Sequence, residues 1–384
     1  MHRRNTFVVA WVLGAMSSAS AVECTMGQVA IDSASVITPC GERLAADNLS
    51  DGDRAQAYFI RGRAYHRALR LNEAAEDYRA AFALDPKNAE ILVSWSNVDM
   101  RQRRVNVSRR RIEQAYALDP RNARVLRAVG ALQSDLGESN RAIEFYSKAI
   151  EIDPTEGFAL YFRAREYRFK RQFAEAIADA NALLAIPTAR LNDAQGFLDE
   201  NGIVRDFHVK ALLELAYSYE DSGRLDLAEK NYDAAVDTGR SAPALAARAH
   251  FLGFYVQRKD DALRDLTEAV HSEPRNAKAL YALGISLAGF NRFEEAFAAF
   301  DAAVTARPDY ATGLTMRARM HRQFGRTDAA VRDLKMAVSL DQSELNDLMN
   351  ALRHAGYWSE PGLPRRQTRE LDDAMRACMI DPQC

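Results

Sequence analysis

Cysteine is scarce in this sequence of 384 residues, and it is absent from the interior. The sequence contains no Cys-x-x-Cys pair and no cluster of cysteine with histidine, so it lacks the ligand spacing of zinc sites. No metal and no other cofactor is predicted. The four cysteines lie near the two ends, at Cys24, Cys40, Cys378 and Cys384.

A large excess of charge of one sign is also lacking. The net charge of −2 at pH 7 provides no basic surplus for a nucleic-acid partner. Lysine supplies only 8 of the 51 basic residues, which leaves 43 arginines. Arginine forms planar, bidentate contacts with carboxylates and phosphates, although a bias in composition accounts for the same count.

Motifs of catalysis are missing as well. The sequence has no Walker loop, dinucleotide fingerprint, G-x-S-x-G or H-E-x-x-H motif, and its seven histidines form no pair at ligand spacing. We therefore expect that the protein is not an enzyme, although an active site assembled from distant residues stays open.

The apolar run at the start is too short to span a membrane. Phe7 to Met16 falls short of the ~20 residues that a spanning helix needs, and it follows Arg3 and Arg4. Ala19-Ser20-Ala21 then fits an A-x-A-like cleavage pattern. Residues 1–21 thus predict a signal peptide cleaved near Ala21 and a soluble mature protein, periplasmic or secreted. The paired arginines leave a twin-arginine signal open.

The interior of the chain repeats one pattern, which is clearest in residues 277–310. Apolar and small residues recur there in two groups at helical spacing, separated by a predicted turn at Asn291-Arg292. Such a helical hairpin cannot bury its own apolar faces and needs neighbours. The groups are Leu280, Leu283, Gly284 and Leu287, then Ala296, Phe300 and Ala303, closed by Pro308.

Two sets of regularly spaced residues indicate that further hairpins of this kind are present along the chain. Prolines that end helices, such as Pro86, Pro120 and Pro154, lie 34 residues apart. A small residue opens each second helix at the same step, except for one step of 52 residues between Ala176 and Ala228. The small residues are Ala74, Ser108, Ala142, Ala176, Ala228, Ala262, Ala296 and Ala330.

This period and pattern resemble the tetratricopeptide repeat (TPR) family. The resemblance is carried best by residues 277–310, by Leu126-Gly130 with Ala142, Tyr146, Ala149 and Pro154, and by Tyr58, Gly62 and Tyr65 with Ala74, Tyr78, Ala81 and Pro86. It implies an all-α, right-handed α-solenoid of about eight helix-turn-helix repeats with a C-terminal helical cap.

The long step in the repeat predicts an insert that interrupts the stacking and acts as a hinge or as a loop over the groove. The expected organisation begins with a signal peptide (1–21) and an N-terminal segment (22–54), which has no clear helix between Cys24 and Cys40. Repeats one to four (55–188) and repeats five to eight (208–342) follow, with residues 189–207 between them as the segment of the insert, which itself starts at Pro187. A C-terminal helical cap (343–384) ends the chain.

The resemblance implies that the first helix of each repeat lines a concave groove. In the first four repeats the expected groove positions are rich in arginine and carry aromatic residues, while Glu90 and Asp135 are the only acids among them. A solvated charged face explains the same pattern. The candidate binding residues are Phe59, Arg63, Arg67, Asn97, Arg101, Arg124, Arg127, Tyr161, Arg165 and Arg168, and His66 and Phe158 are further expected groove positions.

The last four repeats have mixed groove positions. We expect at least one of the aromatic residues there to pack in the core and the others to anchor a partner. The positions are Tyr217, Glu220, Asp221, Arg248, Phe251, Phe254, Tyr255, Tyr281, Arg319 and Arg322.

The two chain ends carry the remaining signals. Because a solenoid holds its ends apart, local disulfides between Cys24 and Cys40 and between Cys378 and Cys384 are favoured among the three possible pairings. The C-terminal element predicts a cap, but it also faintly resembles a peptidoglycan-binding-like module.

The resulting functional expectation is an exported scaffold that binds a protein or an extended peptide in its groove, and the arginines there favour an acidic partner. An envelope protein that binds cell-wall glycan through its C-terminal element is the alternative.

Overall fold

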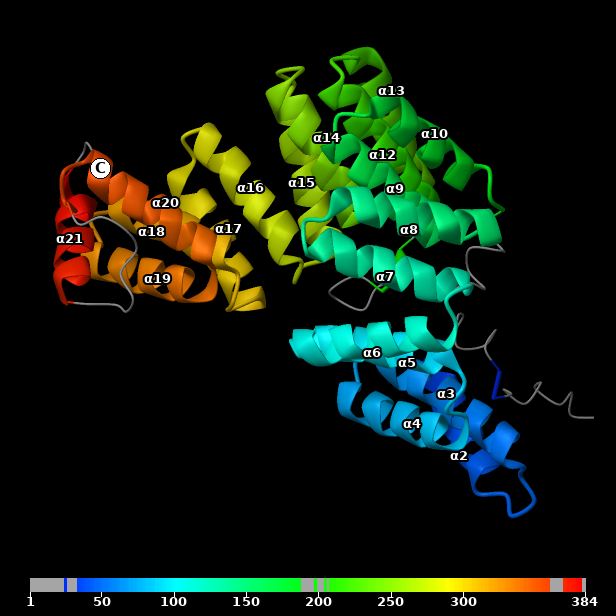
Figure 1. Cartoon of the computed structure of the whole chain (residues 1–384). Helices are drawn as coiled ribbons and strands as arrows, with labels where there is room; N and C mark the ends of the chain where they lie inside the picture. Colours follow the sequence, from blue (N-terminus) through cyan, green and yellow to red (C-terminus); the bar gives the residue numbers. More distant parts are fainter. Residues whose placement is uncertain are drawn as a thin grey trace, which may run out of the picture. The chain divides into compact units, whose positions relative to one another are not determined.

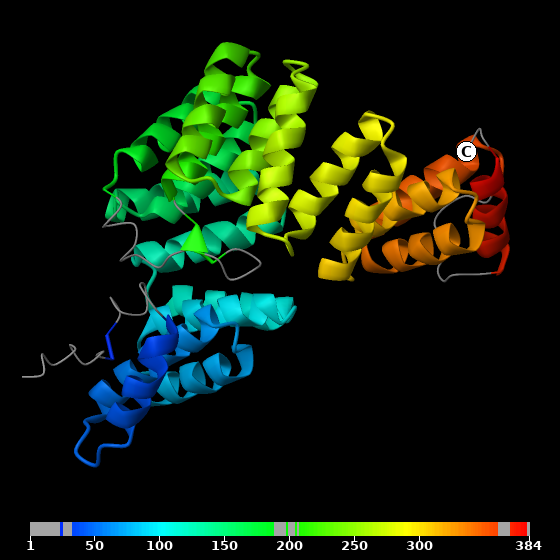
Figure 2. The same cartoon turned by 180° about the vertical axis from the view of Figure 1, so that it is seen from behind.

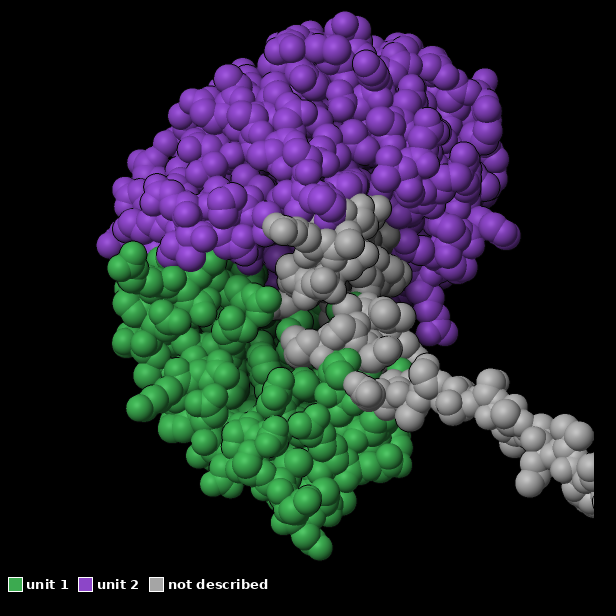
Figure 3. All heavy atoms as spheres, turned by 90° about the vertical axis from the view of Figure 1, so that its right-hand side faces the viewer, with its two compact units in different colours: residues 1–132, 192–195 green, residues 133–191, 196–384 purple. Residues whose placement is uncertain are grey.

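The computed structural model describes residues 24–25, 33–187, 197–198, 204–205, 207–359 and 369–381. The expected signal peptide, most of the expected insert and Cys384 lie outside these ranges. The described residues up to Leu132 belong to one compact unit and those from Gln133 onward to a second (Figure 3), which we call unit 1 and unit 2.

Unit 1 is helical throughout its described length. Its helices are connected by short turns, and the last of them continues into the first residues of unit 2. They are α2 (Ser33–Leu44), α3 (Asp51–Arg67), α4 (Leu71–Leu84), α5 (Ala89–Arg101), α6 (Val105–Leu118) and α7 (Ala123–Asp135).

Unit 2 continues the same pattern and adds one short antiparallel pair of strands, β1 (Phe197–Leu198) and β2 (Val204–Arg205). Its helices are α8 (Ser139–Ile152), α9 (Gly157–Phe169), α10 (Phe173–Leu184), α12 (Phe207–Asp221), α13 (Leu225–Thr238), α14 (Ala242–Phe254), α15 (Lys259–Ser272), α16 (Ala277–Gly289), α17 (Phe293–Ala306), α18 (Ala311–Gln323), α19 (Thr327–Leu340), α20 (Gln342–His354) and α21 (Arg369–Ile380).

The helices pack as hairpins at the predicted period (Figures 1 and 2). In unit 1, α3 packs on α4 and α5 on α6. In unit 2, α9 packs on α10, α12 on α13, α14 on α15, α16 on α17, and α18 on α19. With α7 and α8 these account for the eight expected repeats. None of the described helices combines the length and the apolar character needed to cross a bilayer.

The small residues that set the repeat period are the points of closest approach between helices. All eight are at most 3% exposed, from Ala74 to Ala330. Gly284 serves the same purpose on the facing helix, because a Cβ built there would lie 2.6 Å from Cε1 of Phe300. Gly284 and Ala296 therefore lie where the axes of α16 and α17 approach each other closely.

The turn inside each hairpin needs one residue with positive φ. That residue recurs every 34 positions, except for one step of 52 from Arg171 to Gly223 across the insert, and it is often not glycine, even though the left-handed region disfavours side chains with a Cβ. The glycines at this position are Gly137, Gly223 and Gly325, and the other residues are Leu69, Arg103, Arg171, Gln257 and Asn291.

Bidentate ion pairs link the two helices of several repeats. Arg61 binds both carboxylate oxygens of Asp77 at 2.7 and 2.8 Å. In unit 2 the arginine also reaches the second helix of the preceding repeat, as Arg248 does by contacting Asp233 at 2.9 Å. Buried pairs of this geometry are costly to break from one side. The other pairs are Arg163 with Asp179, Arg248 with Asp265, and Arg317 with Asp333.

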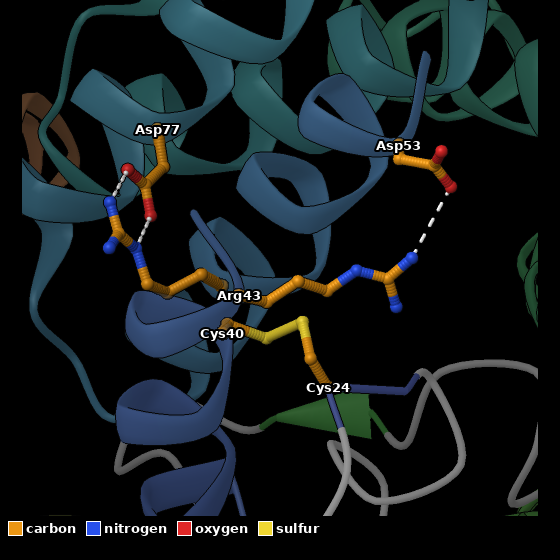
Figure 4. The surroundings of a disulfide bond; sticks show 6 residues. Cys24, Cys40, Arg43, Asp53 and Asp77 are labelled. Atoms are coloured by element: carbon orange, nitrogen blue, oxygen red, sulfur yellow. Dashed lines mark hydrogen bonds and ion pairs between the residues drawn. A yellow bond between two sulfur atoms is a disulfide. The ribbon is translucent and has the colours of Figure 1, made fainter. Parts of the chain in front are cut away.

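The segment before the first repeat is helical, which corrects the expectation that it contains no clear helix. Cys24 and Cys40 form the predicted disulfide, and Cys40 lies on α2 (Figure 4). Val36 and Cys40 are fully buried and belong to one apolar cluster with Ile60 of α3. The sequence hid this helix because Pro39 lies inside it. We infer that the disulfide and the packing on α3 hold it, so that α2 covers the first repeat.

The predicted C-terminal cap is present as α20 and α21. Leu352, Leu371 and Met375 are buried in a cluster that includes Val331 and Leu334 of the last repeat. Figure 2 shows α20 and α21, in orange and red, beside α18 and α19. Cys378 is buried in the same cluster, while its expected partner Cys384 lies outside the described residues.

The repeats on the two sides of the insert stack directly on each other, contrary to the expectation that the insert interrupts the stacking. Leu183 and Ile186, at the end of the fourth repeat, share a core with Phe207 and Ala211 of α12. Phe158 joins this core with its ring centroid 4.7 Å from that of Phe207. Through these apolar contacts the fourth repeat packs directly on the fifth.

Candidate binding groove

Three helices of unit 1 carry a cluster of cationic side chains. Arg63 and Arg67 lie one turn apart on α3, where Arg63 is only 8% exposed. Burial is the main cause that lowers the pKa of Arg63 to about 10, and the charges of Arg124 of α7 and of Arg67 act in the same direction. We call Arg63, Arg67, Arg101 and Arg124 the arginine cluster. Like charges that are close enough to affect one another give a surface a positive potential.

His66 lies inside the arginine cluster. Burial, followed by the charges of Arg101, Arg63 and Arg67, lowers the pKa of His66 to about 3. The imidazole is therefore neutral at physiological pH. Its Nε2 atom is buried and has no hydrogen-bond partner among the described residues.

The predicted residues on α5 and α7 are less buried than Arg63. Arg124 donates a hydrogen bond to Glu90 at 2.7 Å, which joins α5 and α7, and about a third of each of these two side chains is exposed. Arg101 and Arg127 are half-buried, and Asn97 is exposed on α5. Unit 1 therefore carries eight of the twelve expected groove positions of the first four repeats, and the binding role of these residues stays a prediction.

A cavity of about 480 Å³ opens beside the arginine cluster. Its apolar walls include Phe59, whose ring also lies 5.9 Å from the guanidinium carbon of Arg63. The sequence gives little sign of this cavity: Gln56 lies three residues before Phe59, on the same face of α3, but the other walls come from the turn before α5, from α5 and from α7. The lining residues are Gly52, Ala55, Gln56, Phe59, Ile60, Asp85, Asn88, Glu90, Ile91 and Arg124.

The predicted residues of unit 2 form a balanced polar network instead of a row of one sign. Arg168 pairs with Glu214 at 3.2 Å and with Asp221 at 3.0 Å, both of α12. Burial opposes the charged form of Arg168, but these carboxylates raise its pKa. Burial raises the pKa of Glu214, an effect that Arg168 partly offsets. The expectation of a continuous basic row therefore needs correction at Arg168.

Aromatic side chains surround the remaining predicted residues of unit 2. The guanidinium of Arg165 lies 5.7 Å from the ring centroids of both Tyr161 and Phe169. Burial raises the pKa of Tyr161 to about 12. Phe169 and Phe254 are 60% and 67% exposed, so they are available as apolar contact surface.

Comparison with known proteins identifies the repeating unit. Two family profiles described as "Tetratricopeptide repeat" match the chain, one at residues 94–156 and 254–311 and the other at residues 55–88 and 209–238. The chain is built from tetratricopeptide repeats. No curated protein matches it.

Solved structures of other tetratricopeptide-repeat folds are similar to this chain at low identity. Yeast Tom70 is 14% identical, with a TM-score of 0.59 over 83% of this chain and 68% of its own. The Cut9–Hcn1 hetero-tetramer of the APC/C is 13% identical, with a TM-score of 0.50 over 90% of this chain and 59% of its own. At these identities the likeness concerns the fold alone.

Phe158 and Arg248, two expected groove positions, belong to the interior instead, while the buried Phe251 confirms the expectation that at least one aromatic residue of the last four repeats packs in the core. Phe158 and Phe251 are buried in apolar clusters. Arg248 pairs with Asp265 and Asp233 inside and between repeats. Each of these residues packs against or pairs with a residue on an adjacent helix. The place of a residue in the repeat pattern does not identify such a partner.

Proposed function

We propose that this chain is an exported tetratricopeptide-repeat scaffold that binds an acidic protein segment or extended peptide at the arginine cluster of unit 1. The observation that carries the proposal is the convergence of Arg63, Arg67 and Arg101 around the neutral His66. A concave surface with charge of one sign speeds the encounter with a partner of opposite sign. Phe59 supplies apolar contact surface that charges at a wet rim do not.

Export is supported by two features of the N-terminal region. Residues 1–21 have the pattern of a signal peptide, and the disulfide between Cys24 and Cys40 suits an oxidising compartment. We propose a periplasmic or secreted location, with the mature chain starting at Val22. Sequencing the N-terminus of the protein recovered from the periplasm or the medium tests this, and an intact Met1 in that material would count against it.

A test of partner charge uses full-length protein and fluorescein-labelled peptides rich in either glutamate or lysine. The variant Arg67→Glu/Arg101→Glu should lose about tenfold or more in affinity for the glutamate peptide at low salt, because reversed charge repels the partner. The salt dependence of binding should flatten at the same time.

The matched control is Arg79→Glu/Arg110→Glu, which makes the same change of net charge at exposed positions of α4 and α6 in the same unit. It should bind within about twofold of the wild type, since exposed charges away from the site are screened by salt. Equal losses in the two variants, or equal binding of glutamate and lysine peptides, would show that the arginines are only a solvated face.

The alternative function, binding of cell-wall glycan by the C-terminal element, has weaker support. Leu352, Leu371 and Met375 of that element are buried against the last repeat, so their apolar surface is already used in capping. Co-sedimentation with isolated peptidoglycan tests it directly. Sedimentation that is lost when the exposed face of α21 is mutated would favour the alternative.

A further inference from the structure

The polar residues in the wall of the unit 1 cavity share one chemical character. Each carries a planar amide, carboxylate or guanidinium group, and these groups come from α3, from the turn before α5, from α5 and from α7. The polar residues are Gln56, Asp85, Asn88, Glu90 and Arg124. The cavity's volume of about 480 Å³ lies within the range of ~300–1,000 Å³ that is typical of small-ligand sites. The cavity can therefore hold a small ligand that forms several hydrogen bonds.

Charges of the two signs largely offset each other in this wall. Arg124 donates a hydrogen bond to Glu90 at 2.7 Å, and Asn88 donates one to Asp85 at 3.1 Å. An ion of either sign would meet a like charge here, because the wall holds both carboxylates and a guanidinium. A purely apolar ligand would separate these groups from water without replacing its hydrogen bonds, which is costly. The wall therefore favours a neutral, polar ligand.

Hydroxyl groups match the hydrogen-bonding capacity of this wall. A carboxylate has two oxygens and about four lone-pair sites, so Asp85 and Glu90 can each accept further hydrogen bonds beside those from Asn88 and Arg124. The amide of Gln56 both donates and accepts. A hydroxyl donates one hydrogen bond and accepts others, so neighbouring hydroxyls on one ligand can satisfy carboxylate and N–H groups together.

An aromatic and aliphatic surface complements these polar groups. The half-buried ring of Phe59 lines the cavity together with Ile60 and Ile91, which are 2% and 1% exposed. The face of an aromatic ring carries a negative potential, so it attracts the weakly positive hydrogens of C–H groups. A ligand that suits both kinds of wall has hydroxyls around its edge and C–H groups on its face. This combination is the chemistry of a pyranose sugar ring.

We propose that the unit 1 cavity binds one neutral pyranose unit, either as a free monosaccharide or as the end of an oligosaccharide. The C–H face of the sugar packs on Phe59, and its hydroxyls form hydrogen bonds with Asp85, Glu90 and Gln56. This inference goes beyond the proposed function, because it assigns a neutral ligand to the cavity. The acidic partner contacts Arg63, Arg67 and Arg101, which are not part of the cavity lining.

The experiment measures the binding of simple sugars to the full-length protein by saturation-transfer difference NMR. Methyl glucoside and methyl N-acetylglucosaminide are titrated, and tetrahydropyran is the control ligand because it has the same ring without hydroxyls. At least one glycoside should bind about tenfold or more tightly than tetrahydropyran, as expected for hydrogen bonds to charged groups. A chitin tetrasaccharide separates the two sources. A site for the end of an oligosaccharide binds it at least as tightly as the methyl glycoside, whereas a site for free monosaccharides excludes it.

The variant Gln56→Ala/Glu90→Ala removes an amide and a carboxylate from the wall, and it should weaken glycoside binding by about tenfold or more. The matched control Glu113→Ala/Gln114→Ala removes the same two residue types from exposed positions of α6 outside the lining. It should bind within about twofold of the wild type. A second variant, Phe59→Leu, keeps an apolar wall without the aromatic face and should weaken binding by about threefold or more. Circular dichroism checks that the helical content of each variant matches the wild type.

The outcomes separate this inference from the proposed function. Because the sugar is neutral, its affinity should not change with salt or in Arg67→Glu/Arg101→Glu. Equal binding of the glycosides and tetrahydropyran, or equal losses in the test and control variants, would overturn the inference and leave acidic binding intact. Glycoside binding that is lost in Arg67→Glu/Arg101→Glu would also overturn it, by placing the ligand at the arginine cluster. If glutamate and lysine peptides bind equally while glycoside binding responds to the cavity variants, the proposed function fails and this inference stands.

Discussion

For several arginines on the first helix of a repeat, the residue 16 or 17 positions later determines whether an ion pair forms within the repeat. Arg61 and Arg248 each meet an aspartate there, on the second helix, and become part of the repeat itself. Arg63 has Arg79 instead of an aspartate at that distance, and its guanidinium is close enough to Arg67 and Arg124 for their charges to lower its pKa. The sequence alone could have made this distinction for Arg248. Reading each helix face separately missed it because the partner lies on the other helix.

A substitution at Gly284 tests whether α16 and α17 approach each other too closely to accommodate one added Cβ atom. In Gly284→Ala the new Cβ would lie 2.6 Å from Cε1 of the fully buried Phe300, so one of the two helices must shift. We expect a loss of about 1–3 kcal/mol in the free energy of unfolding, measured by urea denaturation. The control Gly289→Ala, at the end of the same helix, meets no described atom within 4 Å and should change stability by about 0.5 kcal/mol or less.

His66 predicts a pH dependence of stability. Its pKa is about 3 in the folded protein and about 6.5 when unfolded, so the unfolded chain binds more protons at acidic pH. The free energy of unfolding is therefore not reduced by protonation of His66 above pH 6.5. It falls as the pH drops from 6.5 toward 3, by at most about 1.4 kcal/mol per pH unit. Unfolding free energies at pH 7 and pH 5 should differ less in His66→Gln than in the wild type. Parallel pH profiles for the two proteins would contradict the assignment.

At the scale of the elements, the sequence was most informative where structure is local. Hairpins recur every 34 residues because apolar periodicity, small contact residues and closing prolines all lie within one repeat. The helix α2 was missed because Pro39 argues against it, and its support comes from Cys24 and from Ile60 of another helix. Such tertiary support leaves no periodic pattern in the sequence.

The positive-φ turn provides a test at this scale. Leu69 adopts φ 60°, a left-handed conformation that is unfavourable for a residue with a Cβ. Its side chain is 45% exposed, so little packing offsets this unfavourable free energy. Leu69→Gly should raise the free energy of unfolding by about 0.5–1 kcal/mol. The reverse change at the matching position, Gly137→Leu, should lower it by about 1–2 kcal/mol. Melting temperatures of both variants measure the effect, and shifts of the same sign would contradict a backbone cause.

At the scale of the whole molecule, the periodic sequence gives no sign of where the chain divides. The 34-residue step runs through α7 without a change, yet the division between the two compact units falls within that helix. The cavity was equally hidden, since it needs α3, α5 and α7 together. Both features depend on how repeats pack on one another, whereas the repeat pattern records how each repeat is built.

Because repeats contact mainly their neighbours, a change at one end should remain local. The variant Cys24→Ser/Cys40→Ser removes a link across 16 residues, which the chain-entropy account values at about 3 kcal/mol. The cluster formed by Val36, Cys40 and Ile60 then loses its covalent support. Hydrogen exchange followed by mass spectrometry should show faster exchange in α2 and α3, with α14 to α19 unchanged because their cores lie wholly in unit 2. Faster exchange that is equal in both units would mean that the chain unfolds as one cooperative body, and that α2 does not act as a local cover of the first repeat.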